Sequence, residues 1–395
     1  MRLARTLVPI AIAAALLARA PVAAQTARTE DERRRLEALK TLPYLQWTEE
    51  KVDEKERGVT LYERALASPG YTLYSGPARA VLVDMEGNVA HEWTNANLKE
   101  WEYAEMLPNG DLIVLLSRRS ISRLDWSGRL LWERGLPVHH DFCFMPDGDV
   151  AVLAHEKVLV PEISGQPIES DAIARISPAG KITTFWHLHE HRRELARWCP
   201  PAALTSVSEN VPDDDWSHSN TIEVIVETPA AASIEAFRPG NILFCARNLD
   251  FVGIIDARSG EIVWGWGPGE LDHPHQPSLL SNGHILVFDN GFFRGWSRVV
   301  EYDPVSASVV WEYRTERRED FFSMGRGSCQ KLPNGNVLIT DSTHGRVFEV
   351  TPDGRTVWTF FNPDRSHEKR GTFYRASRYP ATLVQALLRM HEGAP

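Results

Sequence analysis

The sequence predicts an all-β protein, a six-bladed β-propeller with four-stranded blades, from two repeated features. The first is a strand that ends in tryptophan after a Gly or Asp turn, at Trp93, Trp132, Trp186, Trp264, Trp311 and Trp358. The second is an apolar hairpin about a Gly turn, in residues 101–117, 140–155, 275–290 and 327–342. An outer hairpin follows, as in residues 122–134, 252–266 and 346–360, and two hairpins make one blade. We expect each tryptophan to fill the space between neighbouring blades.

The first 24 residues are typical of a secretory signal peptide. Arg2 and Arg5 precede an apolar run over residues 7–17, and the small residues 22–24 fit a signal-peptidase site. The apolar run is too short to cross a bilayer. We therefore expect a periplasmic or secreted protein with no membrane anchor after cleavage.

The rest of the chain is expected to form one propeller with short flanking segments. Residues 25–57 predict an N-terminal arm with a helical stretch near residues 30–42. The propeller is expected over residues 58–363, and residues 364–395 should form a C-terminal extension that packs on it and helps close it. The N-terminal blade should use the strands 58–63, 70–75, 78–85 and 89–93. One inner hairpin, over residues 217–247, is interrupted by an insertion at 226–237.

Charge and cysteine content narrow the classes of partner. The chain has a formal charge of −10, and loss of the three arginines of the signal peptide leaves −13. An acidic surface repels nucleic acid and anionic lipid. The four cysteines show no metal-ligand spacing, and no sequence motif indicates a cofactor.

The hairpin register brings an unusual set of histidines to one end of the propeller. Counted from the turn, the first inner-strand position holds His140, His275, Gly327 or Glu102. Hairpin strands are antiparallel and inner strands line the central channel, so these residues and their ladder partners should converge on one funnel. The predicted set is His140, His155, His218, Asn220, Arg247, His275, Asn290, Ser342 and Thr343, with Glu102 as the one acid in register. His344 follows Thr343 next to this set, the directions of His139 and His273 stay open, and Gly327 should leave one side of the funnel open.

This donor set suits a compact oxyanion. A guanidinium offers a bidentate fork to sulfate or phosphate oxygens, and amide and imidazole groups complete the cage. Glu102 must then point away from the anion or pair with a cation. An imidazole is partly neutral near pH 7, so one histidine is available as nucleophile or base.

Several segments of the chain resemble the bacterial arylsulfate sulfotransferase family. They are DDDWSHSNTI, FCARNLDFVGIID, SGEIVWGWG, HPHQPSLLSNGHILVFDNG and LPNGNVLITDSTHGRVFEV. The similarity covers residues 58–363 and is strongest over 213–361. It implies an exported six-bladed propeller that moves a sulfuryl group from a phenolic sulfate ester to a phenol through a sulfohistidine, without a nucleotide donor.

The resemblance also implies a role for each matching residue. His275 would be the nucleophile, and a hydroxyl near the donor would come from Ser342 or Thr343. The residues that bind and polarise the sulfate would be His140, His218, Asn220 and Arg247. His218 is our first choice to protonate the leaving phenolate and later deprotonate the acceptor. The chain lacks room for the N-terminal β domain through which known members dimerise, so its oligomeric state stays open.

Two other classes of function stay open. The histidines around the axis also suit a metal-dependent lyase or hydrolase, with Glu102 as a further ligand, although Arg247 would repel a cation. Propellers also serve as non-catalytic binding modules. Substitution of His275 distinguishes the three classes. It should abolish sulfuryl transfer in a sulfotransferase, metal content in a metal-dependent enzyme, and neither in a binding module.

Overall fold

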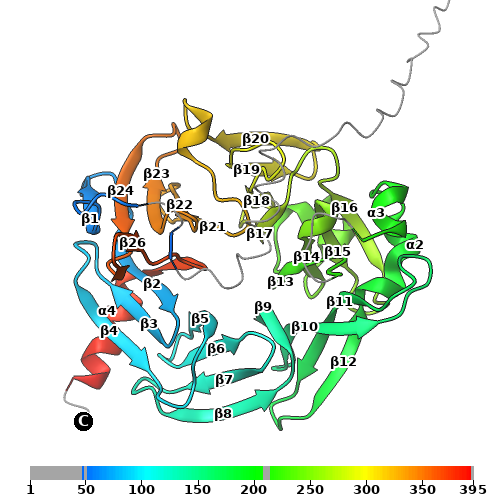
Figure 1. Ribbon diagram of the computed structural model, residues 1–395, viewed down its shortest axis with the longest axis horizontal. Helices are drawn as coiled ribbons and strands as arrows, with labels where there is room; N and C mark the ends of the chain where they lie inside the picture. Colours follow the sequence, from blue (N-terminus) through cyan, green and yellow to red (C-terminus); the bar gives the residue numbers. More distant parts are fainter. Residues whose placement is uncertain (1–46, 49–50, 208–213, 393–395) are drawn as a thin grey trace, which may run out of the picture.

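The computed structural model describes residues 47–48, 51–207 and 214–392, in which six β-sheets surround a central axis (Figure 1). The predicted all-β, six-bladed propeller with four-stranded blades is confirmed. The predicted signal peptide and the helical stretch near residues 30–42 lie outside the described residues. No helix in the described part is long and apolar enough to span a bilayer.

Blades two to five each consist of four consecutive antiparallel strands, with the first strand innermost. Blade two contains β5 (Trp101–Met106), β6 (Leu112–Leu116), β7 (Ser120–Leu124) and β8 (Leu130–Gly135). Blade three contains β9 (Val138–Phe144), β10 (Val150–Val158), β11 (Ile168–Ile176) and β12 (Ile182–His187). Blade four contains β13 (Ser219–Val224), β14 (Ile242–Ala246), β15 (Phe251–Ile255) and β16 (Ile262–Trp266). Blade five contains β17 (Pro274–Leu279), β18 (Ile285–Asp289), β19 (Arg298–Asp303) and β20 (Ser308–Tyr313).

Blades one and six close the ring with strands from both ends of the described chain. Blade one contains β2 (Gly70–Gly76), β3 (Arg79–Val83) and β4 (Val89–Thr94), and its inner strand is β27 (Ala376–Pro380). Blade six contains β21 (Ser328–Lys331), β22 (Val337–Asp341), β23 (Arg346–Val350) and β24 (Thr356–Phe361), and β1 (Gly58–Tyr62) adds a fifth strand beside β24.

The closure corrects the strand assignment made from the sequence. The strand expected at 58–63 belongs to blade six rather than to the N-terminal blade, and the C-terminal extension contributes a blade strand. Local alternation identifies a strand, but it does not specify which sheet edge the strand joins. Arg378 on β27 ties the closing blades together, because its buried guanidinium pairs with Glu349 on β23 and bonds the carbonyl of Ser68 at 2.7 Å.

The hydrophobic core is divided among the spaces between blades. Each of six clusters of buried side chains joins two neighbouring blades. Outer-strand tryptophans bridge the same spaces: the indole N–H of Trp186 donates to Gly260 at 2.9 Å, and that of Trp358 donates to Met85 at 2.9 Å. These contacts agree with the expected inter-blade role of the tryptophans.

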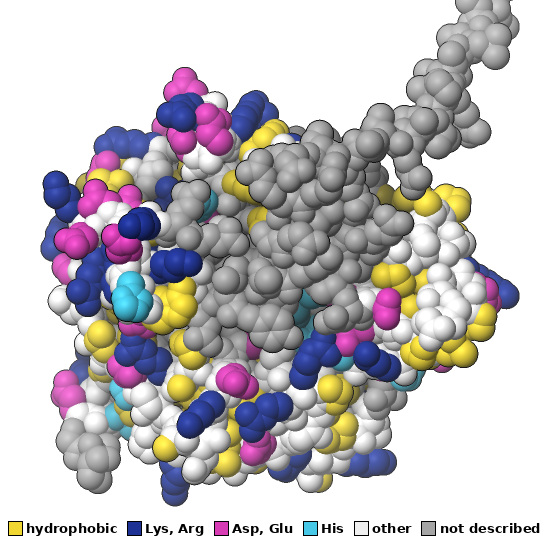
Figure 2. Space-filling model, in the orientation of Figure 1, with side chains coloured by type: hydrophobic (Ala, Val, Ile, Leu, Met, Phe, Trp, Pro, Cys, Tyr) yellow, Lys and Arg dark blue, Asp and Glu magenta, His cyan; other side chains and the backbone are white. Residues whose placement is uncertain are grey.

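Short helices occupy the connections between strands. They are η2 (Leu188–His191), α2 (Arg192–Leu195), α3 (Pro201–Thr205), η3 (Pro229–Ala232), η4 (Glu235–Phe237), η5 (Arg247–Leu249) and η6 (Arg318–Asp320). A small hairpin of β25 (Arg365–Ser366) and β26 (Lys369–Arg370) precedes β27, and α4 (Ala381–His391) packs Val384 and Leu387 against blades one and two. Figure 2 shows acidic and basic side chains interspersed on the described surface of one face.

Candidate active site

The inner strands of three neighbouring blades begin with the histidines predicted for the funnel. His140 lies on β9, His218 directly precedes β13, and His275 lies on β17. His140 and His218 have left-handed backbone, with φ of +58° and +48°, and the ladder of blade five shifts register after His275. Strained or bulged residues re-aim side chains and are common at functional sites. The rings of His140 and His218 lie 4.7 Å apart, and burial followed by the charge of Arg247 lowers the pKa of both His218 and His275.

His275 is held as one neutral tautomer. Its Nδ1 lies 2.7 Å from Oδ1 of Asn290 and 3.2 Å from the backbone carbonyl of His273. The carbonyl can only accept, and the amide of Asn290 is oriented because its Nδ2 donates to the carbonyls of Ser323 and Arg326 at 2.6 and 2.8 Å. Nδ1 of His275 therefore carries the proton. Nε2 keeps its lone pair, is buried and has no hydrogen-bond partner among the described residues.

Burial sets the charge state of His275. Desolvation is the largest cause that lowers its pKa, to about 3, and the nearby Arg247 lowers it further. The imidazole is therefore neutral at neutral pH, which a nitrogen nucleophile requires.

His218 has a different partner, the carboxyl group of Asp215. The two side chains form a short hydrogen bond between Nδ1 and Oδ2, and the backbone N–H of His218 donates to Oδ1 at 3.1 Å. Burial raises the pKa of Asp215 well above its usual range and lowers the pKa of His218 well below it. With Asp215 protonated toward Nδ1, His218 presents Nε2–H, so the pair holds a proton that it can give away.

Arg247 supplies positive charge beside these histidines. It is 4% exposed, its Nε donates to Oδ1 of Asn248 at 3.0 Å, and its backbone N–H donates to the carbonyl of His218 at 3.2 Å. Burial lowers its pKa to about 10, so it stays charged at neutral pH. The charge of a second, half-buried arginine, Arg326, also lowers the pKa of Arg247. The sequence prediction missed Arg326, because it lies in the loop before β21 and outside the hairpin register.

The other predicted polar residues, Asn220, Ser342 and Thr343, have different hydrogen-bond partners. Asn220 donates to the carbonyl of Pro274 at 2.9 Å, so its amide braces the residue before His275. The hydroxyl of Ser342 donates to the carbonyl of Phe373, whereas Thr343 Oγ1 lies 3.4 Å from Ser323 Oγ beside the loop that holds Asn290. Thr343 is thus the better placed of the two candidate hydroxyls.

Glu102 and Gly327 line the remaining sides of the funnel. Glu102 accepts from the backbone N–H of His140 at 3.3 Å, and its charge opposes the effect of burial on the pKa of Arg326. At Gly327 a Cβ would lie 2.6 Å from ring carbons of Phe288, so that position has no room for a side chain. His344 turns to Asp341, with a shortest distance of 2.9 Å between Nδ1 and the carboxylate.

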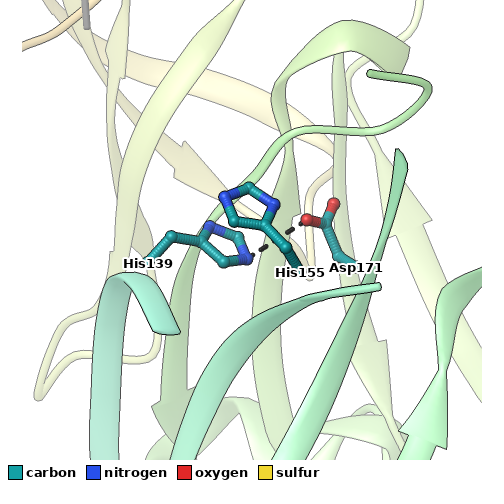
Figure 3. A group of neighbouring side chains, drawn as sticks. All are labelled: His139, His155 and Asp171. Atoms are coloured by element: carbon teal, nitrogen blue, oxygen red, sulfur yellow. Dashed lines mark ion pairs between the residues drawn. The ribbon is translucent and has the colours of Figure 1, made fainter. Parts of the chain in front are cut away.

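A second cluster adjoins His140 in blade three and contains His139, His155 and Asp171 (Figure 3). The rings of His139 and His155 stack at 3.8 Å, and His139 Nε2 lies 3.2 Å from Asp171 Oδ1. His155, predicted to bind substrate, places Nδ1 3.2 Å from Glu169 Oε1 instead. The sequence prediction did not include Asp171, which lies on the third strand of its blade.

This cluster is one of three groups of possible metal ligands among the described residues, but its geometry does not favour a metal. Its ligand atoms lie within 4.8 Å of one another. However, an imidazole binds a metal along an in-plane lone pair, and two rings stacked at 3.8 Å with an angle of 15° between them cannot both point at one ion. The adjacent Glu169 already receives two bonds from Arg118, at 2.7 and 2.6 Å, which brings a positive charge to the site.

A separate surface pocket of about 410 Å³ lies beside the Arg247 segment. Its lining includes Trp198, Asn248, Asp250 and Pro268. Because none of the converging histidines lines it, we place the chemistry in the funnel.

Comparisons with known proteins identify a family and a fold. The family model described as Arylsulfotransferase (ASST) matches residues 103–363. No curated protein sequence matches the chain. A solved protein of unknown function from Bacteroides caccae is 14% identical with a TM-score of 0.52, over 79% of this chain and 99% of its own. A streptogramin B lyase is 11% identical with a TM-score of 0.45, over 80% of this chain and 86% of its own.

Proposed function

The chain belongs to the arylsulfotransferase family, and on that premise we propose that it moves a sulfuryl group from a phenolic sulfate ester to a phenol through a sulfohistidine at His275. The observation that carries this proposal is the buried Nε2 of His275, which keeps a fixed lone pair and has no hydrogen-bond partner among the described residues. The partners are a small phenolic sulfate donor and a phenolic acceptor. No nucleotide, metal or other cofactor is required.

In the first half-reaction, Nε2 of His275 attacks the sulfur of the donor. The N–S bond forms while the S–O bond to the phenol breaks, and the leaving oxygen takes its electron pair and a proton from Nε2 of His218. The proton shared between Asp215 and His218 shifts to Nδ1 as this occurs. Asn290 keeps its Nδ1 partner throughout, so His275 needs no reorientation.

The sulfate oxygens are bound by the remaining donors of the funnel. Sulfuryl transfer spreads charge over these oxygens and therefore rewards fixed cations and hydrogen-bond donors. Arg247 offers a planar fork for two oxygens, and Thr343 offers a hydroxyl. The donor phenol leaves before the acceptor enters, which predicts ping-pong kinetics.

The experiment that tests this proposal uses purified mature protein, 4-nitrophenyl sulfate and phenol after treatment with a chelator. We expect nitrophenolate release that depends on phenol, survives chelation and disappears in His275→Asn. The control His284→Asn changes a half-buried histidine in the turn of the same blade, which pairs with Glu301 at 2.7 Å. Intact-protein mass spectrometry after donor addition should show one added SO₃ in the wild type and none in His275→Asn.

The same experiment separates the alternatives. Loss of activity on chelation, with recovery on adding a divalent metal, would favour a metal-dependent lyase or hydrolase. A folded protein that releases no nitrophenolate and takes up no SO₃ would favour a binding module.

We also propose that the protein acts in the periplasm or is secreted, because residues 1–24 have the pattern of a signal peptide. Detection of a mature N-terminus near residue 25 in the exported fraction tests this. Full-length protein confined to the cytoplasm would contradict it.

A further inference from the structure

We propose that Asp171 and His139 form a relay that fixes the tautomer of His140 and makes His140 the base that deprotonates the acceptor phenol. This inference rests on the proposed function. It divides the acid–base work between two histidines, because His218 gives its proton to the leaving phenolate and His140 receives one from the acceptor. Asp171 and His139 act through His140 and are therefore positioning residues.

The relay begins at Asp171, which is buried and ionised. Its Oδ2 accepts from the hydroxyl of Ser217 and the backbone N–H of Ser219, both at 2.6 Å, which orients Oδ1 toward His139 (Figure 3). Despite burial, side-chain hydrogen bonds from His139 and Ser217 help hold the pKa of Asp171 at about 2.

The carboxylate determines which nitrogen of His139 carries the proton. Nε2 of His139 lies 3.2 Å from Oδ1 of Asp171, in a contact too bent for an ideal hydrogen bond. A lone pair at that position would face a negative oxygen, whereas an N–H is attracted to it. In the neutral form of His139 the proton therefore sits on Nε2, and Nδ1 presents a lone pair.

That lone pair in turn determines the tautomer of His140. The two Nδ1 atoms of His139 and His140 are 2.9 Å apart, so one must donate and the other accept. Since Nδ1 of His139 accepts, Nδ1 of His140 donates. A second carboxylate favours the same arrangement, because Oε1 of Glu102 lies 3.7 Å from Nδ1 of His140.

His140 consequently presents a bare Nε2 on the opposite edge of its ring. A bare lone pair repels sulfate oxygens but accepts a proton from a hydroxyl. This assignment differs from the sulfate-binding role implied by the family resemblance. Burial is the largest cause that lowers the pKa of His140 well below the usual value, and the charge of Arg247 lowers it further. It is thus unprotonated when the acceptor arrives.

The proton and electrons balance across the second half-reaction. The acceptor oxygen forms a bond to sulfur, its proton moves to Nε2 of His140, and the N–S bond breaks with its electron pair returning to Nε2 of His275. The proton then passes from His140 to His218, whose ring lies 4.7 Å away and which lost a proton in the first half-reaction. The pair of histidines returns to its starting state.

The test is Asp171→Asn, a change that keeps the shape of the side chain and reverses the relay. An asparagine can accept from Ser217 and Ser219 with its oxygen and donate to Nε2 of His139 with its amide, which places a proton on Nδ1 of His139 and then on Nε2 of His140. In Asp171→Asn we expect the burst of nitrophenolate from 4-nitrophenyl sulfate to equal that of the wild type. Transfer to phenol should be slower by about 10²–10⁴-fold, the usual contribution of a general base.

A second acceptor distinguishes the relay from a structural role. Pentafluorophenol is ionised at the assay pH and needs no base, so Asp171→Asn should transfer to it within about tenfold of the wild-type rate. The matched control is Glu301→Gln, which removes a carboxylate bonded to a histidine in blade five and should leave both rates unchanged.

Each other outcome overturns the inference. Equal losses with both acceptors indicate a structural effect, and an unchanged rate with phenol shows that the relay is not used. Stoichiometric zinc in the wild type that is lost in Asp171→Asn would make the cluster a metal site. Absence of a burst in the wild type would contradict the proposed function itself, so that result is distinguishable from failure of the relay alone.

A spectroscopic measurement tests the same point without a variant at Asp171. Nitrogen-15 NMR of histidine-labelled wild-type protein should show His140 protonated at Nδ1 and bare at Nε2, with its signals assigned by their loss in His140→Gln. Protonation at Nε2 would overturn the inference even if Asp171→Asn does not fold.

Discussion

His275 and His218 lie near the starts of the inner strands of neighbouring blades, yet their Nδ1 atoms have different partners. His275 bonds a neutral amide, Asn290, and a backbone carbonyl, whereas His218 bonds the carboxyl group of Asp215. An amide fixes the tautomer without attracting a proton to Nε2, while a carboxyl group adjusts the proton content of the ring. The difference suits one histidine to bond sulfur and the other to carry a proton.

Exchange of the amide for a carboxylate should give the largest effect. In Asn290→Asp the new charge raises the pKa of His275, and two donated bonds to the carbonyls of Ser323 and Arg326 are lost. A proton on Nε2 removes the nucleophile, so we expect the nitrophenolate burst at pH 7 to slow by about 10³-fold and to recover partly at higher pH. Stopped-flow measurement of the burst against pH checks this.

The control for that exchange is Asn282→Asp, in the turn of the same blade, where the side chain bonds His284 at 3.1 Å. It should behave as the wild type. A wild-type burst in Asn290→Asp at pH 7 would show that the amide does not set the state of His275.

The reverse exchange, Asp215→Asn, should have a smaller effect that depends on the leaving group. The pair loses its transferable proton, so cleavage of phenyl sulfate, whose leaving group is basic, should slow by about 10²–10³-fold. Cleavage of 4-nitrophenyl sulfate should slow by no more than about tenfold, because nitrophenolate leaves without a proton. Asp214→Asn, at the exposed neighbouring residue, is the control. Equal losses with both esters would argue against an acid role for His218.

The hairpin repeat explains why the positions of several site residues could be predicted from the sequence. A fixed distance from the turn places His140 and His275 at the start of inner strands, and antiparallel pairing of β17 with β18 brings Asn290, the residue after Asp289, next to that start. These rules involve only backbone geometry, so they hold in any blade with a clear hairpin. The same rules gave the number of blades.

The residues that set proton positions follow no such rule. Asp215 precedes its strand in an acidic run, Asp171 lies on a third strand, and the direction of His139 depends on the left-handed backbone of His140. The only local signal for Asp215 is its position three residues before His218. Long-range closure was equally hidden, because β27 joins β2 across about 300 residues, and no local pattern specifies that pairing.

The smallest predicted effect concerns stability in acid, where the two histidines should again differ. The pKa of His275 is about 3 in the folded protein and about 6.5 when unfolded, so its contribution is fully present above pH 6.5 and is lost as the pH falls toward 3. At pH 4.5 the free energy of unfolding is lower by about 2–3 kcal/mol for this reason, and in His275→Asn this decrease should be absent. Denaturant unfolding at pH 7.5 and 4.5 measures the difference.

For the His218 pair the two contributions oppose each other. His218 has a lowered pKa, so it loses stability on acidification below pH 6.5, whereas Asp215 has a raised pKa and gains stability as the pH falls toward its unfolded value. The double variant His218→Asn, Asp215→Asn should therefore change the acid sensitivity of the free energy of unfolding by less than His275→Asn does. If it matched His275→Asn, the two sites would titrate alike, and a carboxyl partner would not distinguish the acid from the nucleophile.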